Sequence, residues 1–68
     1  MRIRLNGADR ELPEGATVAD GARAAGVEPG VPGVAAALDG EVVPRERWDD
    51  TPLREGCALE VVRAAAGG

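Results

Sequence analysis

The residues best suited to chemistry stand at the end of this 68-residue chain, where Gly67 and Gly68 close the sequence. In a chain with 10 glycines, two in a row at the end would arise by chance roughly once in fifty. A tip without Cβ atoms can enter a narrow channel. A free carboxylate is a poor electrophile, but an acyl-adenylate formed with ATP reacts with sulfur. We therefore predict that the main-chain carboxylate of Gly68 is the working group of the protein.

The side chains offer few alternatives. The chain has no histidine, and its 12 carboxylates are scattered through turns and surface strands without an obvious convergent pair. Asp49 and Asp50 could bind a cation, but a solvated loop is the favoured interpretation. Cys57 could be a reactive thiol, but a small residue at the start of the last strand is favoured, and one cysteine forms no internal disulfide or cysteine-based metal site. The sequence predicts no catalytic residue, no metal site and no bound cofactor, as in a protein that enzymes act upon.

The composition limits the partners and the compartment. The net charge is −4 and Trp48 is the only aromatic residue, whereas surfaces that bind single-stranded nucleic acid combine basic groups with aromatic platforms. The negative charge also argues against anionic membranes, and no apolar run approaches the length of a membrane span. The N-terminus develops no apolar signal region, and one cysteine suits a reducing compartment. We expect a cytoplasmic protein, monomeric on its own, with no nucleic-acid or membrane partner.

The hydrophobic pattern predicts one small α+β domain. Apolar and polar residues alternate in the first strand, and Asn6-Gly7 and Asp39-Gly40 are strong hairpin signals. Thr17 is a candidate helix N-cap. The predicted strands are Met1–Leu5, Ala8–Leu12, Val34–Leu38, Glu41–Val43 and Ala58–Arg63, with a helix at Val18–Ala25, a loop at Val27–Gly33 and one helical turn at Pro44–Trp48.

The stretch from Val34 to Trp48 resembles the central part of the ThiS family, the sulfur carriers of thiamine thiazole biosynthesis. The family pattern is an apolar strand, an Asn/Asp-Gly turn and then Val-Val-Pro-Arg-x-x-Trp. The opening hairpin, Thr17–Asp20, and Gly56–Arg63 with the terminal Gly67-Gly68 are also similar to the family. The resemblance therefore extends over essentially the whole chain.

The resemblance implies a β-grasp, or ubiquitin-like, fold. A mixed sheet of four to five strands would carry one main helix on one face, and the first and last strands would lie side by side. Residues 1–63 would form this domain, and residues 64–68 a flexible C-terminal tail.

The resemblance also implies a mechanism. A ThiF-type adenylating enzyme would use ATP to activate Gly68, and sulfur from a cysteine desulfurase route would convert the adenylate to a thiocarboxylate. Thiazole synthase would then take the sulfur.

The resemblance also suggests which residues contact the partner enzymes. Ala65, Ala66 and Gly67 would thread into the partner enzyme, and Val62, with Ala65, would make apolar contacts near the tail. Val62 could equally pack on the second face of a buried strand. Trp48 is interpreted as a structural anchor, with partner contact as the lesser alternative.

One departure from the family lies in the helix. Family helices carry leucines where this chain has Gly21 and Ala22, and a mid-helix glycine costs about 1 kcal/mol relative to alanine. The remaining apolar face of Val18, Ala22 and Ala25 is thin. We therefore predict a thinly packed helix and modest stability, which a thermal midpoint far above the mesophile range would contradict.

Three other functions stay open on the sequence alone. The protein could carry sulfur for molybdopterin, cysteine or a natural product, with the same chemistry at Gly68. It could be a protein modifier joined through Gly68 to lysines of other proteins, although it has no lysine with which to build chains of itself. It could also be a binding module with an incidental Gly-Gly, which full activity without Gly67 and Gly68 would favour.

Overall fold

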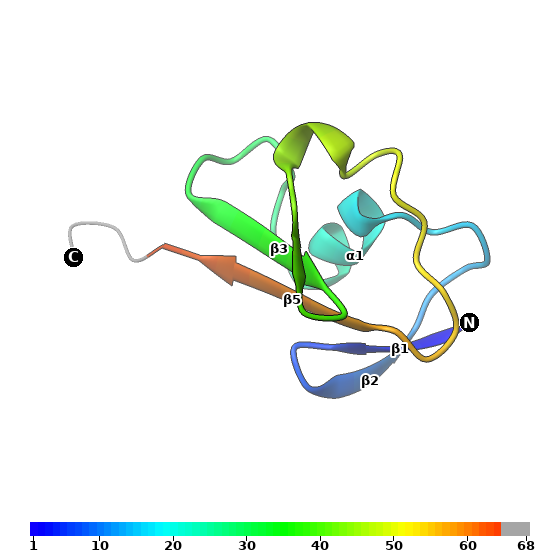
Figure 1. The fold of residues 1–68 in the computed structure, drawn as a ribbon. Coiled ribbons are helices and arrows are strands. Elements are labelled where there is room, and N and C mark those ends of the chain that lie inside the picture. Colours follow the sequence, from blue (N-terminus) through cyan, green and yellow to red (C-terminus); the bar gives the residue numbers. More distant parts are fainter. Residues whose placement is uncertain (65–68) are drawn as a thin grey trace.

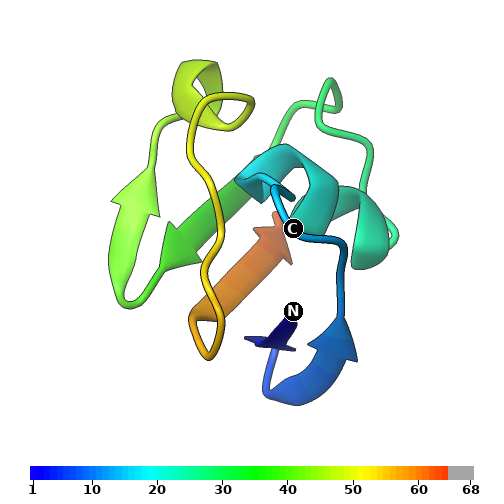
Figure 2. The same ribbon diagram turned by 90° about the vertical axis from the view of Figure 1, so that its right-hand side faces the viewer.

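Five strands form one mixed sheet, and a short helix crosses one of its faces (Figures 1 and 2). The structure, a computed structural model, describes residues 1–64. The elements are β1 (Arg2–Leu5), β2 (Ala8–Glu11), α1 (Val18–Ala24), β3 (Val34–Leu38), β4 (Glu41–Val43), the 3-10 helix η1 (Arg45–Arg47) and β5 (Ala58–Arg63). The strand order is β2-β1-β5-β3-β4, with β5 parallel to β1 and antiparallel to β3. This topology confirms the β-grasp fold and the predicted order of elements.

Two tight turns make the hairpins β1–β2 and β3–β4. In the first, Asn6 and Gly7 have φ angles of 52° and 83°, and in the second Asp39 and Gly40 have φ angles of 49° and 88°. Two successive residues with positive φ twist the turn in the sense that flanking strands require, and Asn-Gly and Asp-Gly tolerate this at least cost. Both predicted hairpins are confirmed.

The same two turns also hold β5 in the middle of the sheet. The Oδ1 atom of Asn6 accepts a hydrogen bond from the Val61 N–H at 2.8 Å, just beyond the end of β1. On the other side, Oδ1 of Asp39 accepts one from the Ala58 N–H at 2.8 Å. Each turn side chain therefore takes the place of a strand carbonyl and satisfies a backbone donor that the short neighbouring strand cannot reach.

The core lies between α1 and the sheet. Alternate residues of β1 and β5 point toward the helix, as the period of two requires. The buried hydrophobic residues are Ile3, Leu5, Ala16, Val18, Ala19, Ala22, Ala36, Val43, Trp48, Leu53, Cys57, Leu59 and Val61. Within residues 1–64, no helix has both the length and the apolar character needed to cross a membrane.

Helix α1 begins with a capping box. The Thr17 N–H donates to Oδ2 of Asp20 at 2.9 Å, and the Asp20 N–H donates to Oγ1 of Thr17 at 3.4 Å. These bonds satisfy donors that have no partner within the helix. The helix ends at Ala24, one residue before the predicted end, and Ala25 forms its C-cap.

Gly21 explains how so small a helix packs. A Cβ atom at this position would lie 2.3 Å from Cδ2 of Leu59 and 3.4 Å from Cδ1 of Leu53. The two leucine side chains come from β5 and from the loop before β5. Because Gly21 has no side chain, the backbone of α1 can lie directly on them. The buried positions of α1 are Val18, Ala19, Gly21 and Ala22, and Ala25, the C-cap, is half-buried and packs against the core. The predicted apolar face of Val18, Ala22 and Ala25 is therefore confirmed. The modest stability stays a prediction.

We expect Gly21→Ala to destabilise the protein although alanine is the better helix former. The methyl group would overlap Leu59, which is 0% exposed and cannot turn outward. Overpacking of this kind costs about 1–3 kcal/mol, against a helix-propensity gain of about 1 kcal/mol, so the free energy of unfolding should fall by up to about 2 kcal/mol. Urea denaturation measures the change. Adding Leu59→Val should make the double variant cost less than the sum of the two single changes, and a stabilised Gly21→Ala variant would contradict this packing.

Candidate functional site

The predicted working residues follow directly from the end of β5. Ala65, Ala66, Gly67 and Gly68 lie outside the described residues. The described chain ends at Ala64, and Figure 1 shows β5 running toward the end of the molecule opposite to the N-terminus. The sheet thus sets the direction of the chain up to Ala64.

The start of β3 holds the last described residues. Arg63 pairs with Val34 and Val62 with Ala35 across the antiparallel β3–β5 ladder. One residue further, the Ala64 N–H donates to the Gly33 carbonyl at 2.7 Å. Backbone pairing therefore continues to Ala64, the first residue of the predicted tail. Gly33 was not identified as a site residue from the sequence, where it only marked a loop rich in proline and glycine.

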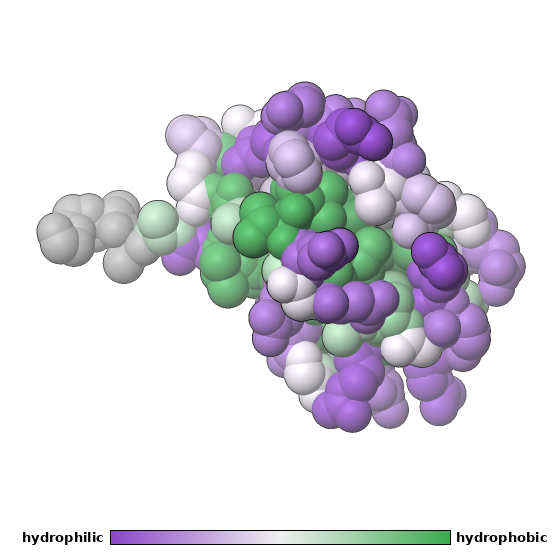
Figure 3. Space-filling model, in the orientation of Figure 1, coloured by the Kyte–Doolittle hydropathy of each residue, from purple (hydrophilic) through white to green (hydrophobic). Residues whose placement is uncertain are grey.

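Val62 lies on the face of the sheet opposite to α1. Its side chain is 59% exposed, and Val42 on β4 is 75% exposed. With Ala35 and Ala37 of β3 these valines form what we call the open-face patch, around a shallow depression of about 150 Å³ that Glu60 borders. Figure 3 shows hydrophobic residues gathered on this face among hydrophilic ones. The alternative that Val62 belongs to a buried second face is wrong for the described part of the chain, because this side of β5 is exposed.

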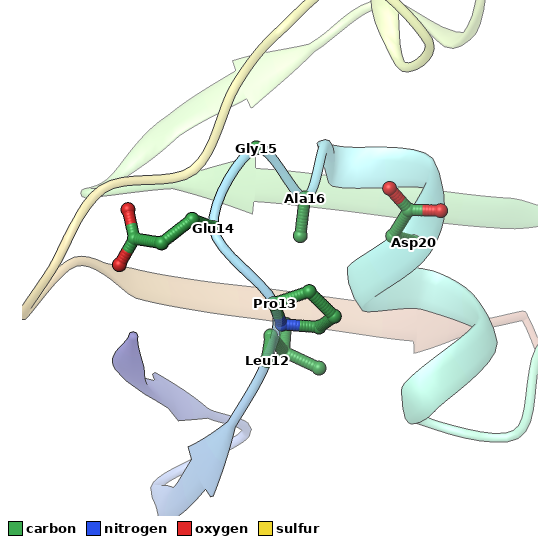
Figure 4. Close-up of a pocket in the computed structure, with 6 residues that line it drawn as sticks. All are labelled: Leu12, Pro13, Glu14, Gly15, Ala16 and Asp20. Carbon is green, nitrogen blue, oxygen red and sulfur yellow. The ribbon is translucent and has the colours of Figure 1, made fainter.

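A larger hollow of about 320 Å³ lies at the junction of β2 and α1 (Figure 4). Leu12, Pro13, Glu14, Gly15, Ala16 and Asp20 line it. In Figure 4 the carboxylates of Glu14 and Asp20 point away from one another. Glu14 lies 3.6 Å from the Met1 amino group and Asp20 accepts a hydrogen bond from Arg23 at 3.2 Å. The hydrogen bond from Met1 to Glu11 raises the pKa of that amino group. The acidic groups here are thus engaged in ordinary surface pairs rather than converging on one point.

The remaining candidates have structural positions. Trp48 is 2% exposed and its Nε1–H donates to the Val43 carbonyl at 2.9 Å, which confirms its interpretation as an anchor. Cys57 is buried immediately before β5, as the structural interpretation predicted. Asp49 and Asp50 are exposed in the loop after η1. Within residues 1–64, no three Cys, Asp or Glu side chains gather as they would around a metal ion.

Comparison with known proteins identifies the group to which this arrangement belongs. The model of the ThiS family matches residues 3–68. The crystal structure of a thiamine biosynthesis protein (ThiS) from Geobacter metallireducens has a TM-score of 0.78 and 30% identity, with 100% of both chains covered. An NMR solution structure of a thiamine biosynthesis protein from the same organism has a TM-score of 0.76 and 29% identity, covering 100% of this chain and 88% of that one. No curated protein matched the sequence. The family model matches nearly the whole chain, and the similar solved structures have the same fold. The chain therefore belongs to the ThiS family.

Proposed function

We propose that this protein is a sulfur carrier of thiamine biosynthesis and that the carboxylate of Gly68 carries the sulfur. The observation that supports this most is the family match over residues 3–68, which includes the terminal Gly67-Gly68. The neighbouring structures, which are thiamine biosynthesis proteins of the same fold, support the same pathway.

The proposed chemistry takes place on a partner enzyme. A carboxylate oxygen of Gly68 attacks the α-phosphorus of ATP on a ThiF-type adenylating enzyme, and pyrophosphate leaves. The terminal sulfur of a persulfide, supplied by a cysteine desulfurase route, then attacks the carbonyl carbon of the adenylate and displaces AMP, which gives an acyl disulfide. A second thiol attacks the other sulfur of this acyl disulfide, forms a disulfide with it and releases the thiocarboxylate of Gly68. Thiazole synthase accepts this sulfur. The carrier binds no cofactor of its own in this scheme and acts in the cytoplasm as a cosubstrate, not as a catalyst.

The end of β5 supports this role by its geometry. Gly68 is the sixth residue after Val62, so the chain from Val62 to Gly68 can span at most about 20 Å. An enzyme that encloses Gly68 in its active site must therefore approach the end of the sheet where Val62 is exposed. We propose that the open-face patch contacts the adenylating enzyme, with Ala65, Ala66 and Gly67 leading Gly68 into its active site.

Intact-protein mass spectrometry tests the proposal. The protein is coexpressed with a ThiF-type enzyme and a cysteine desulfurase as the sulfur source. We expect a mass gain that corresponds to the exchange of one oxygen for sulfur, localised to Gly68 by fragmentation. An unchanged mass, under conditions in which the same enzyme loads an established carrier, would contradict the proposal.

The patch has a test of its own. Val62→Glu should raise the KM for the carrier in the adenylation reaction at least about tenfold, because a charge buried at the centre of an apolar contact costs more than 1.4 kcal/mol. The fold should persist, because Val62 is 59% exposed. Ala8→Glu adds the same charge at an exposed position of the edge strand β2 and serves as the matched control. Equal KM values for both variants would exclude Val62 from the contact.

A further inference from the structure

The side chain of Arg45 binds backbone carbonyls of the loop between α1 and β3. The guanidinium group lies over the Trp48 ring, with Cζ 4.7 Å from the ring centroid. Its Nη1 donates to the Pro29 carbonyl, and its Nη2 donates to the carbonyls of Val31 at 2.6 Å and Val34 at 3.3 Å. Within residues 1–64, no carboxylate lies at salt-bridge distance from Arg45. Its two Nη groups therefore serve the backbone of the loop between α1 and β3 and of the first residue of β3, whereas its Nε is buried without a hydrogen-bond partner among the described residues.

The loop to which Arg45 donates hydrogen bonds also accepts a hydrogen bond from the end of β5. Val31 and Val34 are on either side of Gly33, and Arg45 binds both of their carbonyls. The Gly33 carbonyl between them accepts the Ala64 N–H at 2.7 Å. Figure 1 shows this loop beside η1, at the end of the sheet where β3 begins and β5 ends.

We propose that Arg45 is a positioning residue for the C-terminal segment. Arg45 fixes the carbonyls on both sides of Gly33 and thereby the Gly33 carbonyl, which accepts the hydrogen bond from Ala64. This fixes the point and the direction in which the chain leaves the sheet. A carrier whose last residues start from a fixed point loses less conformational freedom when an enzyme binds them, and so it binds more tightly. The consequence for adenylation rests on the proposed function, whereas the consequence for Ala64 does not.

The direct test measures order at the end of β5. In Arg45→Lys, whose single ammonium cannot serve three carbonyls and the ring together, the ¹⁵N order parameter of Ala64 should fall to about 0.6 or below, from about 0.85 for rigid backbone. The order parameters of Leu59 and Val61 should stay at the rigid value. Arg47→Lys is the matched control, because Arg47 belongs to the same turn and is exposed.

A second variant reaches the loop without altering Arg45 or Trp48. Val31→Gly loosens the backbone at one of the held carbonyls and should lower the order parameter of Ala64 in the same way, even if Arg45→Lys proves unable to fold. Unchanged order at Ala64 in both variants, or in the one that folds, would overturn the proposal.

The functional test uses the adenylating enzyme. Arg45→Lys should raise the KM for the carrier about fivefold, as expected when one or two further residues must be ordered on binding, and should leave kcat within about twofold. Loss of folded carrier would also raise the apparent KM, because the carrier is the substrate in this assay. The folded fraction is therefore measured from the melting curve, and the KM is calculated for the folded carrier. A KM equal to that of wild type would overturn the proposal. If the wild-type protein is not adenylated at all, the proposed function fails, and the order of Ala64 alone decides whether Arg45 positions the chain.

Discussion

Deletion of Gly68 is expected to abolish thiocarboxylate formation and to leave the fold unchanged. The shortened chain still ends in a glycine carboxylate, that of Gly67, but this group ends about 3.5 Å short of the reacting position. A misplacement of about 1 Å can cost about a hundredfold in rate, so we expect adenylation to fall at least about a thousandfold. The ATP–pyrophosphate exchange rate measures the adenylation step, and intact mass measures the sulfur.

The control for this deletion keeps the length of the chain. Gly67→Ala retains the carboxylate of Gly68 at its place and adds only one methyl group, so it should retain measurable adenylation where the deletion has none. Both variants should have the same Tm as the wild type, because β5 and every described core residue lie before Ala64. Full sulfur loading of the shortened chain would show that Gly68 is not required as the attachment point and that the carboxylate of Gly67 can carry the sulfur.

The local parts of this fold could be predicted because local residues determine them. Asn6-Gly7 and Asp39-Gly40 favour positive φ whatever surrounds them, and Thr17 with Asp20 forms its capping box within four residues. The central position of β5 is different, because it depends on pairing with β1 and β3 over long sequence separations. Periodicity gives the faces of a strand but not its neighbours, so only the family resemblance placed β1 beside β5.

The site could be predicted only in part. The role of Gly68 was suggested by the Gly67-Gly68 pair and by the family resemblance, and it stays a prediction. The alternation of Leu59 and Val61 with Glu60 placed Val62 on the second face of the last strand, but it could not decide whether that face is buried. The 59% exposure of Val62 shows that it is not.

Arg45 shows why some roles escape sequence analysis. An arginine in a polar turn is normally a solvated surface residue. Here the guanidinium donates to three backbone carbonyls that lie 11 to 16 residues earlier in the sequence, a contact that no spacing rule describes. Gly21 is similar, since its cost to the helix was visible in the sequence but its contact with Leu59 was not.

Replacement of Trp48 by alanine is expected to have the largest effect on stability. The side chain is 2% exposed, donates to the Val43 carbonyl at 2.9 Å and lies under Arg45. Truncation of a buried tryptophan costs about 3–5 kcal/mol. A 68-residue domain has a total stability of about 3–10 kcal/mol at typical values per residue. Trp48→Ala should therefore lower Tm by at least about 15 °C or leave the protein unfolded at room temperature, as circular dichroism would show.

Trp48→Phe separates the packing of this side chain from its hydrogen bond. Phenylalanine keeps a buried ring beside Arg45 but leaves the Val43 carbonyl without its donor, which should cost about 1–3 kcal/mol and give an intermediate Tm. This order of stabilities follows only if Trp48 is an internal anchor. If Trp48→Ala melted within a few degrees of wild type and instead raised the KM for the carrier on the adenylating enzyme, the anchor interpretation would be wrong. The residue would then act by contact with the partner, and Arg45 would lose the support that its position over the ring provides.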